Sequence, residues 1–283
     1  MLQWYYLALI SSILFGFSTL VEKKSLNKEH AMAFTSSFAI VAAIISLLFI
    51  PLADFSISLV SVILIYVISV VVALTYLLIA RVYKHCNVSA ASPIYTALPS
   101  LFVVLFAFLF LGEELSPVRY LFIGVLVAAT YLIMFTGKKQ FESKKYVYWL
   151  VLASLLSTIS AIGVKYLLFS VTPFTYLILL EVFIALNMIV AMHVKYGGMK
   201  EIMRNTITYK KEIIAVSLLI TAYRITYYLS ASVAQISLVW PLSNVPNVIM
   251  VVFFSSMLFK EDSTKRKLVL AVVMIIAAYF LVV

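Results

Sequence analysis

The stretch SAASPIYTALPSLFVVLFAFLFLGEE, residues 89–114, decides the fold, because a similar stretch recurs later in the chain. Residues 237–262 read SLVWPLSNVPNVIMVVFFSSMLFKED. Each stretch holds an apolar run of about 20 residues, the length of a membrane-spanning helix. A serine, a proline and an acidic pair recur at one constant interval, at Ser89 and Ser237, Pro93 and Pro241, and Glu113-Glu114 and Glu261-Asp262. The chain is therefore expected to consist of two related halves.

Composition places the whole chain in the bilayer. Hydrophobic residues make up 65% of the sequence, charged residues 11%, and the mean hydropathy is +1.13. Soluble domains have about 45–50% apolar and about 25% charged residues, so a soluble protein is excluded. Cys86 is the single cysteine, which excludes an internal disulfide. His30, His85 and His193 have no partners at metal-ligand spacing, so neither a metal nor a cofactor is expected.

The net charge of +10 has a distribution that argues against nucleic acid. The basic residues form short clusters between apolar segments, where Lys and Arg mark cytoplasmic loops and meet anionic lipid headgroups. The expected partners are the lipid bilayer and a small-molecule substrate, with no nucleic acid. The first residues, MLQWYYLALISSILFGF, lack a basic n-region and a cleavage site, and predict a retained first span.

Charge clusters and turn residues divide the sequence into ten candidate spans. They are approximately 2–22, 31–52, 57–80, 88–111, 117–136, 146–169, 173–194, 211–231, 236–259 and 267–283. The basic clusters follow the first, third, fifth, seventh and ninth spans, and only Arg119 lies on the other side. The positive-inside rule then makes the basic loops cytoplasmic and leaves both termini outside. The prediction is an all-α integral membrane protein with ten transmembrane helices.

Five spans per half place the second half upside down relative to the first. The predicted units are residues 1–140 and 141–283, two inverted five-helix repeats. A looser echo at a slightly shorter interval supports this division, because FGFSTLVEK ends at Lys23 and STISAIGVK ends at Lys165. Inverted repeats are typical of transporters, whose sites lie near the midplane beside interrupted helices. Four prolines inside spans four and nine are the predicted kinks and gates: Pro93, Pro99, Pro241 and Pro246.

The segment ASPIYTALPSLFVVLFAFLFLGEELSPVRYLFIGVLVAATYLIM, residues 91–134, resembles the EamA repeat of the drug/metabolite transporter superfamily. The likeness covers nearly the whole chain as two tandem repeats. The second copy departs from it, because FKED replaces LGEE, and the arginine frequent in the second span of a repeat is replaced by Ala39 and Glu181. The resemblance implies an exporter of amino acids or other metabolites in a prokaryotic plasma membrane, with a central cavity lined by both halves.

Two charged residues lie deep in predicted spans. Arg224 is about 11 Å, and Glu181 about 13 Å, from the outer end of its span at 1.5 Å per residue. A buried carboxylate and guanidinium offset much of each other's desolvation cost. One interpretation is a structural ion pair between neighbouring spans; the other is that these residues hold a charged substrate or a proton. Lys165 lies near a span end, where it either binds substrate or snorkels to the interface.

Further candidates for the substrate site lie next to these charges and to the prolines. Tyr227 is one turn beyond Arg224 on the same helical face. Tyr95 and Trp240 stand beside the prolines of spans four and nine, and Ser92 and Asn244 would add hydrogen bonds there. Aromatic walls with a few charges suit small amphipathic organic molecules better than bare ions.

These features predict a secondary transporter of small organic metabolites, acting by alternating access as a monomer or homodimer. The alternative within transport is a flippase for a lipid-linked cargo. An enzyme is not expected, because HExxH and GxSxG motifs are absent, and no GxxxxGK loop exists for direct drive by ATP. A receptor or scaffold without transport is disfavoured, because the loops leave little surface for partners.

Overall fold

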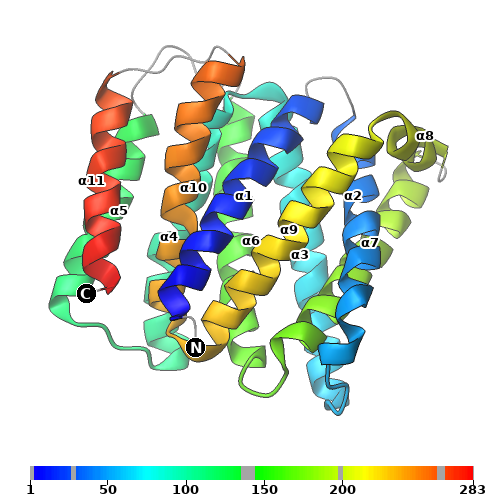
Figure 1. Cartoon of the computed structure of the whole chain (residues 1–283), viewed down its shortest axis with the longest axis horizontal. Helices are drawn as coiled ribbons and strands as arrows, with labels where there is room; N and C mark the ends of the chain where they lie inside the picture. The colour runs from blue at the N-terminus through cyan, green and yellow to red at the C-terminus, as the bar shows by residue number, and fades with distance from the viewer. Residues whose placement is uncertain (1–2, 27–29, 135–143, 197–199, 260–264, 283) are drawn as a thin grey trace.

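The computed structural model describes residues 3–26, 30–134, 144–196, 200–259 and 265–282, and the elements in them are helices (Figure 1). In chain order they are α1 (Trp4–Leu26), α2 (Ala31–Ser46), η1 (Leu47–Leu52), α3 (Leu59–His85), α4 (Val88–Leu111), α5 (Pro117–Met134), α6 (Lys144–Leu167), α7 (Pro173–Tyr196), α8 (Lys200–Thr208), α9 (Lys210–Val233), α10 (Ile236–Phe259) and α11 (Lys265–Val282).

Eight of these helices are long and apolar enough to cross a membrane. They are α1, α2 with η1, α3, α4, α6, α7, α9 and α10. The fifth and tenth predicted spans are also helices, α5 and α11, of 18 residues each. Large apolar side chains such as Leu48, Phe110 and Val194 are at least 70% exposed, as lipid-facing residues are. The protein is therefore a multi-pass membrane protein, while the count of ten spans stays a prediction.

The helices run roughly parallel, and their ends separate by charge (Figure 1). The labels N and C lie at one end of the bundle, and α8 lies at the other. The basic last turns of α1 and α3 carry Lys23, Lys24 and Lys84, and both turns lie at the α8 end. Arg119 is in the first turn of α5, at the opposite end.

The short helix α8 was not predicted, because residues 195–210 lie between two predicted spans and carry a basic cluster. One side of it, with Ile202 and Asn205, is buried, whereas Met203 and Ile207 are 61% and 72% exposed. The hydroxyl of Ser37 in α2 donates to the Ile202 carbonyl at 3.3 Å. An amphipathic helix of nine residues is too short and too polar to register as a span, but it fits an interfacial position.

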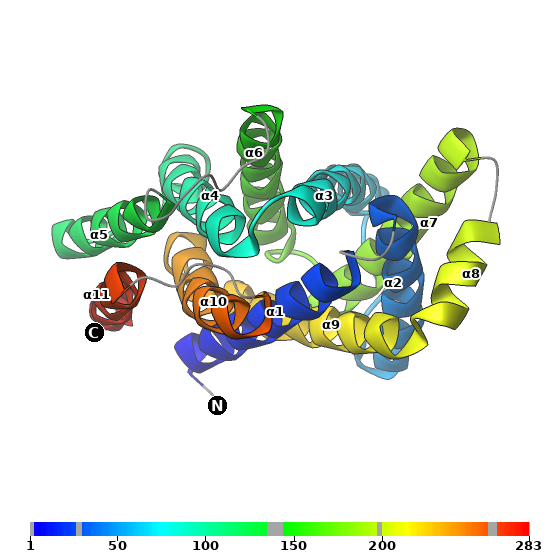
Figure 2. The same cartoon turned by 90° about the horizontal axis from the view of Figure 1, so that it is seen from above.

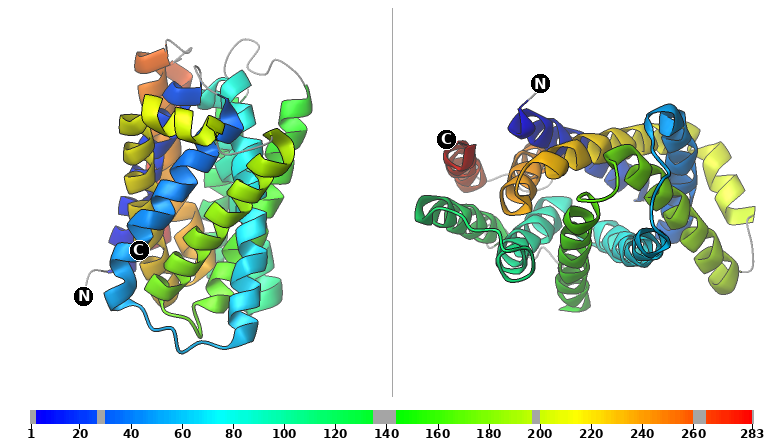
Figure 3. Two further views of the ribbon diagram at one scale, coloured as in Figure 1. Left: turned by 90° about the vertical axis from the view of Figure 1, so that its right-hand side faces the viewer. Right: turned by 90° about the horizontal axis from the view of Figure 1, so that it is seen from below.

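Seen along the helix axes, the bundle has two rows (Figure 2). One row runs α5, α4, α6, α3, α7, and the other runs α11, α10, α1, α9, α2. Helix α1 packs between α9 and α10, as α6 packs between α3 and α4. Across the rows, α4 packs against α10, α5 against α11 and α2 against α7, and Figure 3 shows the same rows from below.

Two buried lysines bind the ends of neighbouring helices. Lys165 Nζ of α6 donates to the carbonyls of Ala231 and Ala234 at the end of α9, both at 2.8 Å. Lys23 of α1 donates to the carbonyls of Tyr83 and Cys86 at the end of α3, the latter at 3.0 Å. The last carbonyls of a helix have no partner inside it, and a cation there also meets the negative end of the helix dipole.

Glu113 binds the N-terminal end of a neighbouring helix, α10. Its carboxylate accepts from the backbone N–H groups of Ile236 and Ser237, at 2.9 and 3.0 Å, and from the Ser237 hydroxyl at 2.6 Å. The turn that presents it depends on Gly112, whose φ of 65° is in the left-handed region that glycine adopts freely. The acidic pair of the quoted stretch thus ties the end of α4 to the start of α10, whereas its counterpart, Glu261-Asp262, lies outside the described residues.

The prolines fall at the predicted places. Pro117 and Pro173 begin α5 and α7, at the first residues of two predicted spans, where a missing backbone N–H costs no helical hydrogen bond. The two proline pairs lie inside helices that are continuous in the structure, Pro93 and Pro99 in α4 and Pro241 and Pro246 in α10.

Candidate functional site

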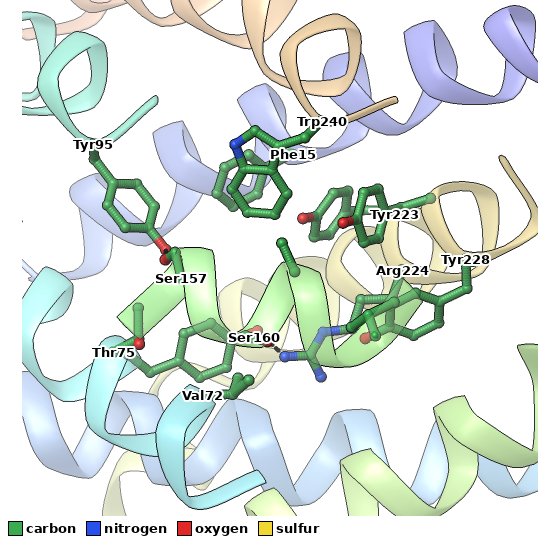
Figure 4. A pocket seen from close by; sticks show the side chains of 14 residues that line it. Phe15, Val72, Thr75, Tyr95, Ser157, Ser160, Tyr223, Arg224, Tyr228 and Trp240 are labelled. Atoms are coloured by element: carbon green, nitrogen blue, oxygen red, sulfur yellow. Dashed lines mark hydrogen bonds between the residues drawn. The ribbon is translucent and has the colours of Figure 1, made fainter. Parts of the chain in front are cut away.

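A small cavity lies at the centre of the bundle, between six helices of the two rows (Figure 4). Its volume is about 80 Å³, and its lining comes from α1, α3, α4, α6, α9 and α10. That is room for several water molecules, and it is below the roughly 300–1,000 Å³ of typical small-molecule pockets. A larger solute would enter only if the lining helices moved apart. Half of the 14 lining residues are aromatic: Phe15, Tyr76, Tyr95, Tyr223, Tyr227, Tyr228 and Trp240.

Arg224 projects into this cavity from the middle of α9 (Figure 4). Its Nη1 atom lies 2.5 Å from Glu181 Oε1 of α7, and the two side chains are 5% and 1% exposed. Its Nη2 atom donates to the hydroxyl of Tyr76 in α3 at 2.6 Å. The guanidinium is thus held between a carboxylate and a phenol, which offsets the cost of burying its charge.

The aromatic residues form a continuous wall across three helices. Phe15 of α1 stacks on Tyr223 of α9, with ring centroids 4.8 Å apart. Tyr223 stacks on Tyr227 one turn later, at 6.0 Å, and Tyr227 meets the edge of Trp240 in α10 at 5.9 Å. Offset and edge-on arrangements of this kind are the favourable ones for aromatic rings. The wall lines this side of the cavity with packed aromatic rings.

Two polar atoms of that wall lack hydrogen-bond partners among the described residues. They are the hydroxyl of Tyr227 and Nε1 of Trp240, whose side chains are 3% and 9% exposed. Buried polar groups are nearly always hydrogen-bonded, so an unpaired one indicates water or a ligand. By contrast, the Tyr95 hydroxyl on the other side is paired with Ser157 at 2.8 Å.

Four of the eight predicted substrate-binding residues line the cavity: Arg224, Tyr95, Tyr227 and Trp240. Glu181 stands behind Arg224 and contacts it without joining the lining. Ser92 and Asn244 are buried outside the lining, and the Asn244 amide donates to the Trp240 carbonyl in its own helix at 2.7 Å. Lys165 also lies outside the lining, because it binds the end of α9.

For Lys165 the structure shows a contact that neither interpretation of the sequence included. Its side chain is 7% exposed, and its ammonium donates to two carbonyls at the end of α9. A helix end with unpaired carbonyls is a tertiary feature, so the residue's own position in the sequence did not indicate it.

The sequence analysis missed Tyr76, Ser157 and Phe15. One signal would have found Tyr76, because Tyr76 and Arg224 are separated by the same interval as Pro93 and Pro241. Phe15 and Ser157 are separated by the shorter interval, that of Lys23 and Lys165. No group of three His, Cys, Asp or Glu residues suited to a metal ion occurs within the described ranges.

Comparison with models of known protein families gives one match. The sequence model of the EamA-like transporter family matches residues 2–135. No curated protein matches the chain. Among solved structures 28 chains match, one of them titled "Crystal structure of protein", with a TM-score of 0.69 and 13% identity over 98% of this chain and 95% of that chain. At this identity the likeness shows the fold alone. Residues 2–135, slightly less than half of the chain, thus match the EamA-like transporter family, and this match is consistent with the drug/metabolite transporter superfamily.

Proposed function

We propose that this protein is a secondary transporter that exports small, amphipathic or amino-acid-like organic solutes by alternating access, with the central cavity as its substrate site. The observation that carries the proposal is the cavity itself, which is buried between the two rows of helices and is lined by Arg224 and by two unpaired polar atoms. Transport rather than catalysis also agrees with the family assignment.

The arrangement of helices supports an inverted repeat of residues 1–140 and 141–283. The proposed matching pairs α1 with α6, α2 with α7, α3 with α9, α4 with α10 and α5 with α11. Under this matching each main contact between helices has a counterpart. The contact of α1 with α9 corresponds to that of α6 with α3, and the contact of α1 with α10 corresponds to that of α6 with α4. The pairs α2–α7, α4–α10 and α5–α11 map onto themselves. This is the pattern that a two-fold axis between the halves would produce.

The lysine contacts support the same matching at the level of single residues. Lys23 and Lys165 are separated by the shorter of the two sequence intervals. The residues whose carbonyls accept their hydrogen bonds are separated by the longer interval, the one that also separates the two proline-bearing stretches. The carbonyls of Tyr83 and Cys86 bind Lys23, and the carbonyls at the matched positions, Ala231 and Ala234, bind Lys165. If the two halves were unrelated, the two lysine contacts would not repeat with both the shorter interval between the donors and the longer interval between the acceptors. Common ancestry of the halves accounts for this repetition.

The cavity then lies on the proposed axis. Three pairs of its lining residues occupy matched positions, namely Phe15 and Ser157, Thr75 and Tyr223, and Tyr76 and Arg224. A site at the interface of two inverted halves is the place where rocking of one half against the other opens access to each side in turn. If the halves rock as proposed, the small volume fits a state in which they lie close together around the site.

The lining also indicates the chemistry of the solute. Trp240 Nε1 only donates hydrogen bonds, and Tyr227 is able to donate as well, so the solute carries an acceptor such as a carbonyl or carboxylate oxygen. The stacked rings favour an apolar or aromatic body. Protonation of Glu181 would remove the ion pair and leave the Arg224 charge buried, which favours facilitated flux or exchange over proton coupling through this carboxylate.

The basic ends give the proposed orientation. The helix ends that carry Lys23, Lys24 and Lys84 lie at the end marked by α8. Under the positive-inside rule that end faces the cytoplasm, which leaves both termini outside the plasma membrane.

The test is solute flux into liposomes that contain purified protein, measured against a panel of amino acids and amphipathic metabolites. Tyr227→Phe removes one unpaired hydroxyl without changing the wall, and Tyr166→Phe is its control, because Tyr166 is 60% exposed on α6. Wild type and Tyr166→Phe should show saturable flux of the same solute. Tyr227→Phe should raise the half-saturating concentration by roughly threefold to tenfold, the value of one hydrogen bond. A panel on which wild type moves no solute would overturn the proposal.

A further inference from the structure

A second cavity lies near the end of the bundle that carries α8, and it shares no lining residue with the central one. Its volume is about 330 Å³, and it is formed by the start of α2, the end of α3 and the start of α6. Five of its nine lining residues are basic, and none of the nine is acidic: the basic ones are His30, Arg81, Lys84, His85 and Lys145. A concave surface lined by one sign of charge concentrates counter-ions.

Aromatic rings of α6 hold these cations in place. The Arg81 guanidinium carbon lies 5.6 Å from the centroid of the Trp149 ring. Lys145 Nζ lies 4.9 Å from the centroid of the Tyr146 ring, and the His85 ring stacks on the same tyrosine with centroids 5.2 Å apart. Residues from two helices thus share one aromatic floor, and the exposed Lys145 and His85 both lie against its Tyr146 ring.

The backbone adds to the positive potential. Ala31 and Met32, in the first turn of α2, line the cavity together with Lys145 and Tyr146, in the first turn of α6. The first N–H groups of a helix have no partner inside it, and they carry the positive end of the helix dipole. The end of α3 carries the negative end of its helix dipole, which favours a cation in its last turn and so explains the position of Lys84. It does not explain Arg81, or Lys145 on another helix.

We infer that this cavity binds a phosphate-type anion, either the phosphate of an anionic lipid headgroup or a soluble phosphate. A planar guanidinium, ammonium groups and helix N-termini together form the donor set that phosphate oxygens prefer. Trp149 and Tyr146 suit a position at the membrane interface, where such rings are enriched, and basic pockets between membrane helices bind lipid headgroups. The inference is independent of the transport proposal, because the two cavities have separate linings.

The test has two arms with the purified full-length protein. In one arm, inorganic phosphate and pyrophosphate are titrated and binding is followed by calorimetry. In the other, native mass spectrometry counts phosphatidylglycerol and phosphatidylcholine retained from mixed micelles. Binding in the first arm identifies a soluble anion, and preferential retention of phosphatidylglycerol in the second identifies a lipid headgroup.

Variants decide whether the binding belongs to this cavity. Arg81→Gln with Lys145→Gln should weaken binding by about tenfold or more, since two charge-assisted contacts are lost. The matched control is Lys210→Gln with Lys211→Gln, which removes two charges at the start of α9, outside the lining. Should the first double variant aggregate, Arg81→Gln alone is judged by the same criterion. The inference would be overturned if neither arm detected binding, or if the cavity and control variants lost binding affinity equally.

Discussion

Replacing Glu181 with Gln should cost far more stability than any change of a surface carboxylate. The substitution keeps the shape of the side chain and removes its charge, so Arg224 is left with the Tyr76 hydroxyl as its described partner. The side chains of Glu181 and Arg224 are 1% and 5% exposed, so the charge that remains stays buried. Breaking one side of a buried ion pair costs about 3–5 kcal/mol, because the remaining charge is uncompensated.

The measurement is equilibrium unfolding in mixed micelles, followed by tryptophan fluorescence. The control is Glu201→Gln, which breaks the ion pair with Arg204 on α8, where the side chains are 45% and 68% exposed. Exposed pairs contribute about 0–1 kcal/mol. The double change Glu181→Gln with Arg224→Gln removes both charges and should be less destabilising than Glu181→Gln alone. A cost for Glu181→Gln no larger than that for Glu201→Gln would refute the assignment of a buried, interacting pair.

Three further predictions use the same unfolding assay. Lys165→Met removes the donor from a buried carbonyl and a partly buried one, and should cost about 1–3 kcal/mol. Hydrogen exchange should rise at the end of α9 but stay unchanged there in Lys23→Met, and equal exchange in both would contradict this. Glu113→Gln keeps one acceptor oxygen where three hydrogen bonds are received and should cost about 0.5–2 kcal/mol, an expectation that fails if stability is unchanged. Gly163→Ala places a Cβ atom 2.5 Å from Cδ1 of Ile68, the end of a side chain that has to turn aside, and should cost about 0.5–1.5 kcal/mol. Gly124→Ala, with nothing within 4 Å, should be neutral or gain up to about 1 kcal/mol, and equal effects would argue against close packing at Gly163.

The helices could be predicted because the bilayer imposes one strong condition on the sequence. Backbone groups in hydrocarbon must be paired internally, so long apolar runs become helices, as the runs ending at Leu111 and Phe259 do. The helix α8 escaped prediction because an interfacial segment obeys a different rule. It needs one apolar face, and Ile202 and Asn205 supply its buried side only once α2 is in place.

The site could be predicted where a residue was costly in its setting. Arg224 and Glu181 stood out because charges in apolar spans need a partner. Their similar depth made an ion pair one of two interpretations, and in the structure they contact each other. Tyr76 and Ser157 did not stand out, because tyrosine and serine are common in membrane helices. Their importance comes from the hydrogen bonds they make across helices, to Arg224 and to Tyr95.

The contact between Tyr76 and Arg224 has a consequence for the proposed mechanism. The two residues occupy matched positions, so in an inverted repeat they meet at the axis, where two arginines would repel each other. One half supplies the charge and the other a neutral acceptor, and Glu181 likewise has only Ala39 as its counterpart at the shorter interval. In a transporter made of two identical inverted halves, each half would adopt in the outward-open state the conformation that the other half has in the inward-open state. The two states would then have equal free energy. The Arg224–Glu181 pair is confined to residues 141–283, so under the proposed mechanism the two states would differ in free energy and the empty carrier would favour one of them.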